Sequence, residues 1–126
     1  MNFPENLKYS EEHEWVRVEG DVCYIGITDF AQKELGDIVY VDIDCLNADL
    51  DLGEVFGTVE AVKTVSDLFM PISGKIIEIN KKLVTTPETV NKDAYGEAWM
   101  VKVAISKPEE LAKLMDSAVY TQKISK

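Results

Sequence analysis

Residues 14–27 read EWVRVEGDVCYIGI and set the pattern for the whole chain. Residues 14–19 alternate between polar and apolar side chains, and residues 22–27 form a second run rich in β-branched and aromatic residues. A period of two is the spacing of a β-strand with one buried face. The intervening Gly20-Asp21 pair supplies turn residues, so the sequence predicts a β-hairpin.

A short helix is expected directly after the hairpin. Thr28 stands where an N-cap side chain accepts a hydrogen bond from the first turn, and the helix would run to Leu35. Gly36 suits the position just after a helix, where glycine adopts a left-handed backbone. Two later β-segments, residues 36–41 and residues 74–79, both begin with glycine and resemble each other. They suit a small barrel or flattened sandwich, which protects sheet edges from pairing with other chains.

The C-terminal part predicts a loop, a strand and a helix. Residues 85–89 are loop-forming, and residues 99–105 form a late strand with alternate apolar side chains on one face. Ser106 and Glu109 have the spacing of a capping box, with a proline in the first turn. The helix that follows would pack on the sheet through an apolar stripe of Leu111, Leu114 and Met115.

Size and composition favour one domain that spans residues 1–126. With 46% hydrophobic residues the chain has enough apolar material for a core. The chain has 13 Lys and Arg residues and 23 Asp and Glu residues, which gives a net charge of −10. Arg17 is the single arginine, and this balance argues against binding to nucleic-acid phosphates. The longest apolar strand-like run, residues 38–41, is far short of the ~20 residues that span a membrane.

The N-terminal residues and the cysteines bear on the cellular compartment. Residues 1–6 show neither a secretory signal nor an organelle transit peptide. Cys23 and Cys45 lack the spacing of a redox or metal motif, so two reduced thiols in a cytosolic protein are expected. We therefore expect a cytoplasmic protein of bacterial type, or a mitochondrial matrix protein if a transit peptide has been removed.

Side chains suited to catalysis or metal binding are sparse. His13 is the only histidine, and neither cysteine lies in a helix start or strained turn that would make it a nucleophile. One histidine and two cysteines are too few for a structural zinc site. An acidic stretch at residues 42–51 lacks the glycine and glutamate of a calcium loop and is expected to be solvated. No catalytic residue and no metal site are therefore predicted.

One segment has a different character: residues 54–74 read EVFGTVEAVKTVSDLFMPISG. Lys63 lies near its centre, between two β-prone arms. If the arms fold back on each other, the lysine stands at a hairpin tip, although no Asn-Gly or Asp-Gly pair marks a turn. Pattern alone also supports one long strand over residues 55–65, with Lys63 as a solubilising surface residue.

The same segment resembles the lipoylation site of the glycine cleavage system H protein family. Further stretches match that family in order and spacing along nearly the whole chain, namely residues 7–9 with 13–16, 25–32, 35–39, 71–76, and 95–96 with 99–100. The shorter biotinyl and lipoyl domains share the hairpin lysine but lack the N-terminal His-Glu-Trp stretch and the C-terminal helix. Two departures flank the lysine: Ala61 replaces the family's usual serine, and Thr64 replaces a frequent alanine.

The resemblance implies a mainly β fold with short helices. The expected architecture is a flattened barrel-sandwich hybrid of the lipoyl and biotinyl type, with extra N-terminal strands and a C-terminal helix. The resemblance also implies that lipoate is joined to the Lys63 amine as an amide, with Glu60 retained as part of the attachment motif. The cofactor would then bring the reactive sulfurs, and the protein would bring position and electrostatics.

As a relative of that family, the chain would be a non-enzymatic carrier of the glycine cleavage system. It would take the aminomethyl group of glycine from the pyridoxal-phosphate-dependent P protein and deliver it to the T protein, which uses tetrahydrofolate. Dihydrolipoyl dehydrogenase, the L protein, would then reoxidise the carrier, and a lipoyl-attaching enzyme would be a fourth partner. The alternatives are a lipoyl-relay protein and another lipoyl or biotinyl carrier module. No nucleic-acid or membrane partner is expected.

The family pattern places Glu14 and Asp67 near the loaded arm, and we expect them to pair with its amine in a surface cleft. The alternative for each is an ordinary solvated side chain. His13 either lines the same cleft or packs beside Trp15, and packing is the favoured expectation. An acidic carrier should meet basic patches on its partners, so their association should weaken with salt.

Overall fold

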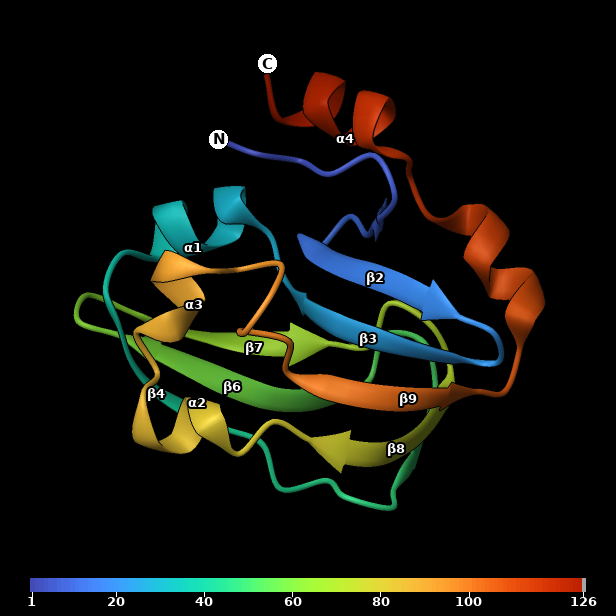
Figure 1. Ribbon diagram of the computed structural model, residues 1–126, viewed down its shortest axis with the longest axis horizontal. Coiled ribbons are helices and arrows are strands. Elements are labelled where there is room, and N and C mark those ends of the chain that lie inside the picture. The colour runs from blue at the N-terminus through green and yellow to red at the C-terminus, as the bar shows by residue number, and fades with distance from the viewer. Residues whose placement is uncertain (126) are drawn as a thin grey trace.

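The computed structural model describes residues 1–125 as two β-sheets with short helices around them (Figure 1). The strands are β1 (Lys8–Tyr9), β2 (Glu14–Glu19), β3 (Val22–Ile27), β4 (Ile38–Asp42), β5 (Asp49–Leu50), β6 (Val55–Ala61), β7 (Val65–Phe69), β8 (Gly74–Ile79) and β9 (Val101–Ile105). The helices are α1 (Asp29–Leu35), α2 (Lys82–Thr85), α3 (Thr89–Lys92), the 3-10 helix η1 (Pro108–Lys113) and α4 (Ser117–Ile124). Within the described residues, no helix has the length and apolar character needed to cross a membrane.

The two sheets are antiparallel and differ in size. The first has six strands in the order β1-β2-β3-β9-β8-β5, and the second has three in the order β4-β6-β7. Side chains from both sheets meet in one core, and the sheets do not join into a closed barrel. The expected flattened barrel-sandwich, mainly β with extra N-terminal strands and a C-terminal helix, is therefore confirmed.

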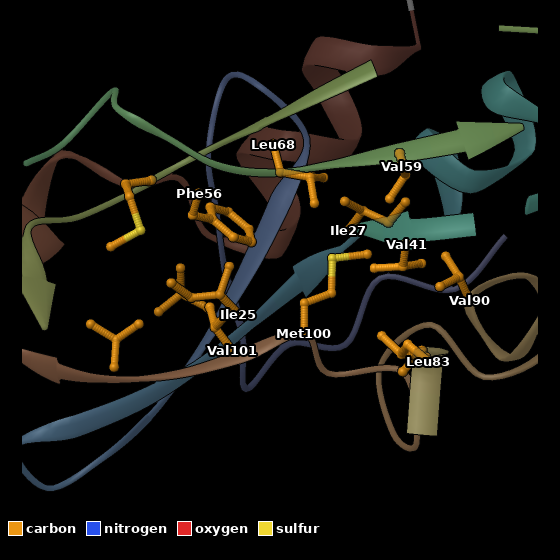
Figure 2. Packing of buried hydrophobic residues seen from close by; sticks show 14 of the residues in the cluster. Ile25, Ile27, Val41, Phe56, Val59, Leu68, Leu83, Val90, Met100 and Val101 are labelled. Carbon is orange, nitrogen blue, oxygen red and sulfur yellow. The ribbon is translucent and has the colours of Figure 1, made fainter. Parts of the chain in front are cut away.

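The core consists of the alternate, inward-facing side chains of the strands. Ile25 of β3 and Val101 of β9 come from the six-stranded sheet, and Val59 and Leu68 come from the three-stranded sheet (Figure 2). Leu83 of α2 closes one end of the same cluster. Burial of each such side chain contributes about 1.5–3 kcal/mol. The period of two seen in the sequence thus corresponds to a real buried face on each sheet.

The predicted hairpin at residues 14–27 is confirmed, because β2 and β3 pair antiparallel along their whole length. Gly20 in the turn has a left-handed backbone with φ 68°. Gly26 lies directly opposite Trp15, and a Cβ atom built on Gly26 would come within 2.7 Å of the indole ring. The indole is fully buried and donates a hydrogen bond of 2.9 Å to the carbonyl of Ala94. Glycine at residue 26 therefore leaves the space that the tryptophan occupies.

The predicted helix after the hairpin is also confirmed, as α1. The Thr28 hydroxyl accepts a hydrogen bond of 3.2 Å from the backbone N–H of Ala31, and Gly36 ends the helix with φ 85°. The two similar segments at residues 36–41 and 74–79 both contain strands, β4 and β8. These strands lie in different sheets, so each sheet contains one of the similar segments.

The C-terminal region differs in part from the sequence expectation. Strand β9 begins at Val101, two residues later than expected. The capping box at Ser106 is wrong, because η1 is preceded by Lys107, which makes no side-chain cap hydrogen bond. Instead, the backbone N–H of Ser106 donates to the carbonyl of Ser73, and buried Glu110 accepts a 2.6 Å hydrogen bond from the Ser73 N–H. Tertiary contacts to the β7–β8 turn therefore replace the local cap.

The predicted C-terminal helix is divided into two. Leu111 and Leu114 pack against the main core, and Met115 packs against a second, aromatic cluster, so the apolar stripe does face the protein. The backbone is extended at Leu114, which ends η1. The helix α4 then begins after Asp116, whose side chain accepts a hydrogen bond of 2.8 Å from the N–H of Val119. This second helix was not predicted separately.

The loop expected at residues 85–89 is only partly correct. Helix α2 ends at Thr85 and α3 begins at Thr89, so the non-helical residues lie between them. Each helix has four residues, which is too short for a hydrophobic period to reveal it. The side chain of Asn91 in α3 accepts a 2.9 Å hydrogen bond from the N–H of Ile38, which fixes the start of β4.

The N-terminal segment and α4 pack together at the top of the view in Figure 1. The Ser117 hydroxyl donates a 2.7 Å hydrogen bond to the carbonyl of Phe3. The Phe3 ring meets Tyr120 edge-on, with 5.5 Å between ring centroids. Tyr120 also stacks on Tyr9 at 4.8 Å. A second, aromatic cluster thus forms outside the two-sheet core.

The Gly26→Ala variant should lose about 1–3 kcal/mol of unfolding free energy, because the added methyl group overlaps the Trp15 ring. Urea unfolding monitored by tryptophan fluorescence measures this loss. Val18→Ala, on the exposed part of the same hairpin, is the control and should change the stability by less than about 0.5 kcal/mol. Equal unfolding midpoints for Gly26→Ala and the parent would contradict the close approach of the two strands.

Candidate functional site

Lys63 lies at the tip of the hairpin formed by β6 and β7. The two strands pair antiparallel up to Glu60 opposite Val65. The turn closes with a 2.7 Å hydrogen bond from the N–H of Ala61 to the carbonyl of Thr64. Lys63 is exposed, and its loop projects at the left edge of Figure 1. The arms therefore fold back on each other, and the alternative of one long strand over residues 55–65 is wrong.

A second hydrogen bond joins the turn to the residues just before β4. The N–H of Val62 donates a 3.0 Å hydrogen bond to the carbonyl of Asp37, just before β4. A Cβ atom built on Gly36 would lie 3.5 Å from the Cε atom of Lys63, so the lysine stem passes close to the end of α1. Glu60 is exposed and pairs in register with both Tyr40 and Val65. The base of the tip is thus a paired sheet, while the lysine itself is exposed.

A surface cleft of about 250 Å³ lies beside this hairpin, between α1 and β7. Its apolar lining includes Ile27, Phe30, Leu35, Val59 and Leu68. Four carboxylates also line it: Glu12, Glu14, Glu34 and Asp67. The structure therefore brings Glu14 and Asp67 to one cleft, as the sequence analysis expected, although they lie on different sheets.

Glu14 occupies an unusual environment for a carboxylate. Its side chain is almost fully buried, with 2% of its surface exposed. One carboxylate oxygen accepts a short hydrogen bond from the hydroxyl of Ser10, and the other accepts a 3.3 Å bond from the N–H of Phe69. Burial raises the pKa of Glu14 to about 7, and the bonds from Ser10 and Phe69 oppose that rise. The alternative of an ordinary solvated side chain is therefore wrong for Glu14.

Asp67 has the opposite environment. It is exposed on β7, and its strand pairs it with Thr58 on β6. Of the four carboxylates that line the cleft, Glu14 is therefore buried and Asp67 is exposed. A cation that enters between them would meet a fixed negative charge on Asp67 and would favour ionisation of Glu14, because an opposite charge lowers a carboxyl pKa.

His13 both lines the cleft and packs on aromatic rings. Its backbone is left-handed with φ 68°, which turns the chain into β2. Its ring lies 4.9 Å from Phe30 and its Nδ1 atom is hydrogen bonded to the hydroxyl of Tyr120 at 2.8 Å. The expected packing beside Trp15 is wrong, because Phe30 and Tyr120 are the aromatic neighbours. Burial, together with nearby Lys123, lowers the pKa of His13, so the ring is neutral at pH 7.

Two residues that line the cleft, Phe30 and Glu34, were not predicted from the sequence, and neither was Tyr120, which contacts the cleft residue His13. Phe30 and Glu34 are four residues apart on α1, so they lie on one face of that helix. This spacing was available in the sequence, but nothing local showed that the face borders β7. Tyr120 was missed because it belongs to α4, which was not predicted separately. Its hydroxyl is hydrogen bonded both to His13 and, at 2.8 Å, to the Thr28 side chain that caps α1.

The cysteines lie in environments that do not activate thiols. Cys23 is fully buried in β3, and burial raises its pKa to about 12. Cys45 is half-buried, and its thiol donates to the carbonyl of Phe56 at 3.2 Å. Burial also raises the pKa of Cys45. Both thiols are therefore protonated at neutral pH. Across residues 1–125, no three His, Cys, Asp or Glu side chains are grouped so that they could hold a metal ion.

Burial of Glu14 should make the protein less stable as pH rises from about 4.5 to about 7. In that interval the folded state keeps a proton that the unfolded chain has released, because its pKa moves from 4.5 to about 7 on folding. A shift of this size corresponds to about 3 kcal/mol. Glu14→Gln should therefore stabilise the protein relative to the parent by about 2–3 kcal/mol more at pH 8 than at pH 5.

Denaturant unfolding at the two pH values measures this difference. The exposed Glu78→Gln variant is the matched control and should show no comparable change between pH 5 and pH 8. A Glu14→Gln effect that is the same at both pH values would mean that the carboxyl group does not titrate in this range.

Comparison with known proteins gives a consistent result. The family model described as glycine cleavage H-protein matches residues 7–126. The glycine cleavage system H proteins of Bacteroides thetaiotaomicron and Brevibacillus brevis are 55% and 56% identical to this chain over 120 residues, which is 95% of this chain and 95% of each relative.

A solved structure agrees with the sequence relatives. The crystal structure of a glycine cleavage system H protein from Mycobacterium marinum superimposes with a TM-score of 0.86, covering 98% of this chain and 100% of that one at 33% identity. Family model, sequence relatives and fold all extend over nearly the full chain, including the Lys63 hairpin. The chain therefore belongs to the glycine cleavage H-protein family, the lipoyl carriers of the glycine cleavage system.

Proposed function

We propose that Lys63 carries lipoate as an amide and that the whole chain, residues 1–126, acts as one carrier domain. The observation that carries the proposal is the exposed lysine at the tip of a paired hairpin, beside a cleft with two carboxyl groups on opposite sheets. Amide formation removes the ammonium charge and adds a dithiolane ring at the end of a flexible arm. The hairpin keeps the attachment point fixed while the arm moves.

The length of such an arm matches the distance to the cleft. The cleft residues Ser66 and Leu68 lie on β7, which begins at Val65, just beyond the turn that holds Lys63. A strand rises about 3.3 Å per residue, so Leu68 lies about 10 Å along β7 from the start of that strand. About ten bonds of roughly 1.5 Å give the arm a reach on the order of 10–15 Å. The far end of the arm is therefore able to enter the cleft or to leave it for a partner.

The carrier cycle has three partner enzymes. When attached to Lys63, the lipoyl group would supply the sulfur that accepts the aminomethyl group of glycine from the P protein, gives its methylene carbon up to tetrahydrofolate on the T protein, and is reoxidised with NAD by the L protein. Lys63 would hold the group through an amide, and Glu14 and Asp67 of the cleft would face its amine. In this cycle the chain itself is non-enzymatic, because the cofactor and the partners supply the reacting groups.

The cleft would protect the loaded arm between partners. The aminomethyl adduct carries an amine and hydrolyses readily. Asp67 offers a hydrated carboxylate, and Glu14 offers a buried carboxyl group that ionises when an ammonium group approaches. Apolar side chains such as Phe30 and Leu68 would exclude water from the thioether part of the arm. These residues thus hold the amine until a partner competes for it.

Membership of the family also suggests a further partner and a cellular location for the chain. A lipoyl-attaching enzyme must act first, and Glu60 would belong to the motif that this enzyme reads. The relatives come from bacteria, which supports a cytoplasmic location with the P, T and L proteins. A chain that only relays lipoyl groups to other enzymes is the alternative, and it would be lipoylated but inert towards glycine.

Lys63→Arg should abolish both lipoylation and glycine-dependent carbon dioxide exchange, because arginine keeps the charge but does not form the amide. Peptide mass mapping of residues 54–74 after expression with lipoate measures the first effect, and exchange with a P protein measures the second. Lys75→Arg, an exposed lysine on β8, is the control and should keep both. A lipoylated parent that supports no exchange would favour the relay function.

Combining Glu14→Ala with Asp67→Asn should shorten the lifetime of the loaded arm. Each lost charge-assisted hydrogen bond is worth about 1.5–3 kcal/mol, so release of formaldehyde should accelerate by about tenfold or more. Asp42→Asn is the matched control, because Asp42 is an exposed strand carboxylate opposite Thr58, on the side away from Asp67. Glu14→Gln keeps an acceptor for the Phe69 N–H and guards against loss of folding. If the aminomethyl group is kept as long by the double variant as by the parent, Glu14 and Asp67 do not bind its amine.

A further inference from the structure

The hydroxyl group of Tyr120 joins two segments that form walls of the cleft, although Tyr120 is not itself a lining residue. The hydroxyl oxygen lies 2.8 Å from Nδ1 of His13 and 2.8 Å from the side-chain oxygen of Thr28. His13 lines the cleft from the loop before β2. Thr28 caps α1, and four residues of that helix line the cleft. One hydroxyl group is therefore bonded to both segments at once.

The hydrogen-bond network assigns the protons of these contacts, because each hydroxyl group has one proton to donate. The Thr28 oxygen accepts a hydrogen bond from the N–H of Ala31 at 3.2 Å. Among residues 1–125 the Thr28 hydroxyl has no acceptor other than Tyr120, so it donates to Tyr120. The Tyr120 hydroxyl then donates to Nδ1 of His13. A neutral His13 ring therefore carries its own proton on Nε2.

Tyr120 is itself held by the aromatic cluster at the C-terminal helix. Its ring is fully buried, stacks on Tyr9 with 4.8 Å between centroids and meets Phe3 edge-on. Burial raises the pKa of Tyr120 to about 12, so the hydroxyl keeps its proton at neutral pH. The aromatic cluster thus keeps a hydrogen-bond donor in a fixed place beside His13.

The backbone of His13 depends on contacts of this kind. Its φ of 68° lies in the left-handed region, which residues other than glycine rarely adopt. Such a conformation persists where the surrounding structure holds it, and it is frequent at functional sites. The His13 carbonyl accepts a 3.1 Å hydrogen bond from the N–H of Thr28, and the His13 ring lies 4.9 Å from the ring of Phe30. A rotation of the His13 ring would therefore change its contact with a cleft residue of α1.

We propose that Tyr120 is a positioning residue for the cleft, and that its hydroxyl group fixes His13 and the start of α1 so that the cleft shields the loaded arm from water. Tyr120 acts through His13 and Thr28. Loss of the hydroxyl leaves the His13 nitrogen and the Thr28 hydroxyl without their partner, so the His13 ring is free to rotate. Water then reaches the loaded arm more often. The inference rests on the proposed function, because it requires an arm on Lys63 that enters the cleft.

The hydrogen bonds are tested first, in the protein without lipoate. Because His13 is the only histidine, labelling histidine rings with ¹⁵N gives the NMR signals of this one ring. The parent should carry the ring proton on Nε2. Tyr120→Phe keeps the buried ring, and it should shift these signals towards a mixture of both tautomers. It should also speed hydrogen exchange at the N–H of Ala31, which is bonded to Thr28.

Each of three results would overturn the inference at this stage. The first is a ring proton on Nδ1 in the parent. The second is the same ring signals in the parent and in Tyr120→Phe. The third is unchanged exchange at Ala31, because α1 would then not depend on the Tyr120 hydroxyl.

The effect on the arm is tested with a second tyrosine as the matched control. Tyr9 is fully buried in the same aromatic cluster, but its hydroxyl donates to the carbonyl of Pro4 instead. Lipoylated parent, Tyr120→Phe and Tyr9→Phe are loaded with glycine and P protein. Release of formaldehyde without tetrahydrofolate is then timed at a temperature where circular dichroism shows all three proteins to be folded.

Release from Tyr120→Phe should be about fivefold faster than from the parent, the effect of one lost hydrogen bond, and Tyr9→Phe should match the parent. Lipoylation should be equal in all three proteins, because both tyrosines lie outside the β6–β7 hairpin. If Tyr120→Phe is less stable but releases formaldehyde at the parental rate, the hydroxyl serves the fold alone and the inference is wrong. Equal acceleration in Tyr9→Phe would assign the effect to the whole aromatic cluster and would contradict the inference as well.

The lipoylation state of the parent separates this inference from the proposed function. If the parent takes no lipoyl group at Lys63, the proposed function fails and the inference fails with it. If the parent is lipoylated and the loaded arm lasts equally long in Tyr120→Phe, only the inference fails.

Discussion

The carboxyl group of Glu14 connects the two sheets at the place where the cleft forms. Glu14 is the first residue of β2 in the six-stranded sheet. Its carboxyl group accepts a hydrogen bond from the N–H of Phe69, at the end of β7 in the other sheet. β7 is an edge strand, so this N–H has no strand partner on that side. The bond therefore satisfies a backbone donor, positions the edge of the second sheet and leaves a carboxyl group at the cleft. Burial of that group disfavours its ionised form, which is why its pKa is raised.

A backbone held by several contacts and an exposed side chain meet at the tip of the β6–β7 hairpin. The hairpin that ends in Lys63 is held by strand pairing, by closure of its own turn and by the bond from Val62 to Asp37. The lysine side chain, in contrast, is exposed. A carrier needs both properties, because a flexible base would spread the arm over unproductive positions and a fixed arm would serve only one partner.

Local signals in the sequence were sufficient for the first hairpin and for α1. Alternation over residues 14–27 and the Thr28 cap depend only on neighbours in the chain, and both were predicted correctly. Features that depend on distant contacts were not predicted correctly. Ser106 does not cap a helix, because its N–H is hydrogen bonded to the carbonyl of Ser73. The helices α2 and α3 have one turn each, which is too short to show a hydrophobic period in the sequence. The position of Lys63 at a tip could not be derived from turn residues, because the turn lacks an Asn-Gly or Asp-Gly pair. Family resemblance supplied that expectation, and the strand register agrees with it.

The hydroxyl of Tyr120 links the last helix to the cleft, since it is bonded both to His13 and to the side chain that caps α1. Tyr120 lies 57 positions after Lys63 in the chain, yet a change in how α4 is seated would move two walls of the cleft together. The position of the C-terminal helix therefore bears on the shape of the cleft at two places, although Lys63 itself lies on the separate β6–β7 hairpin.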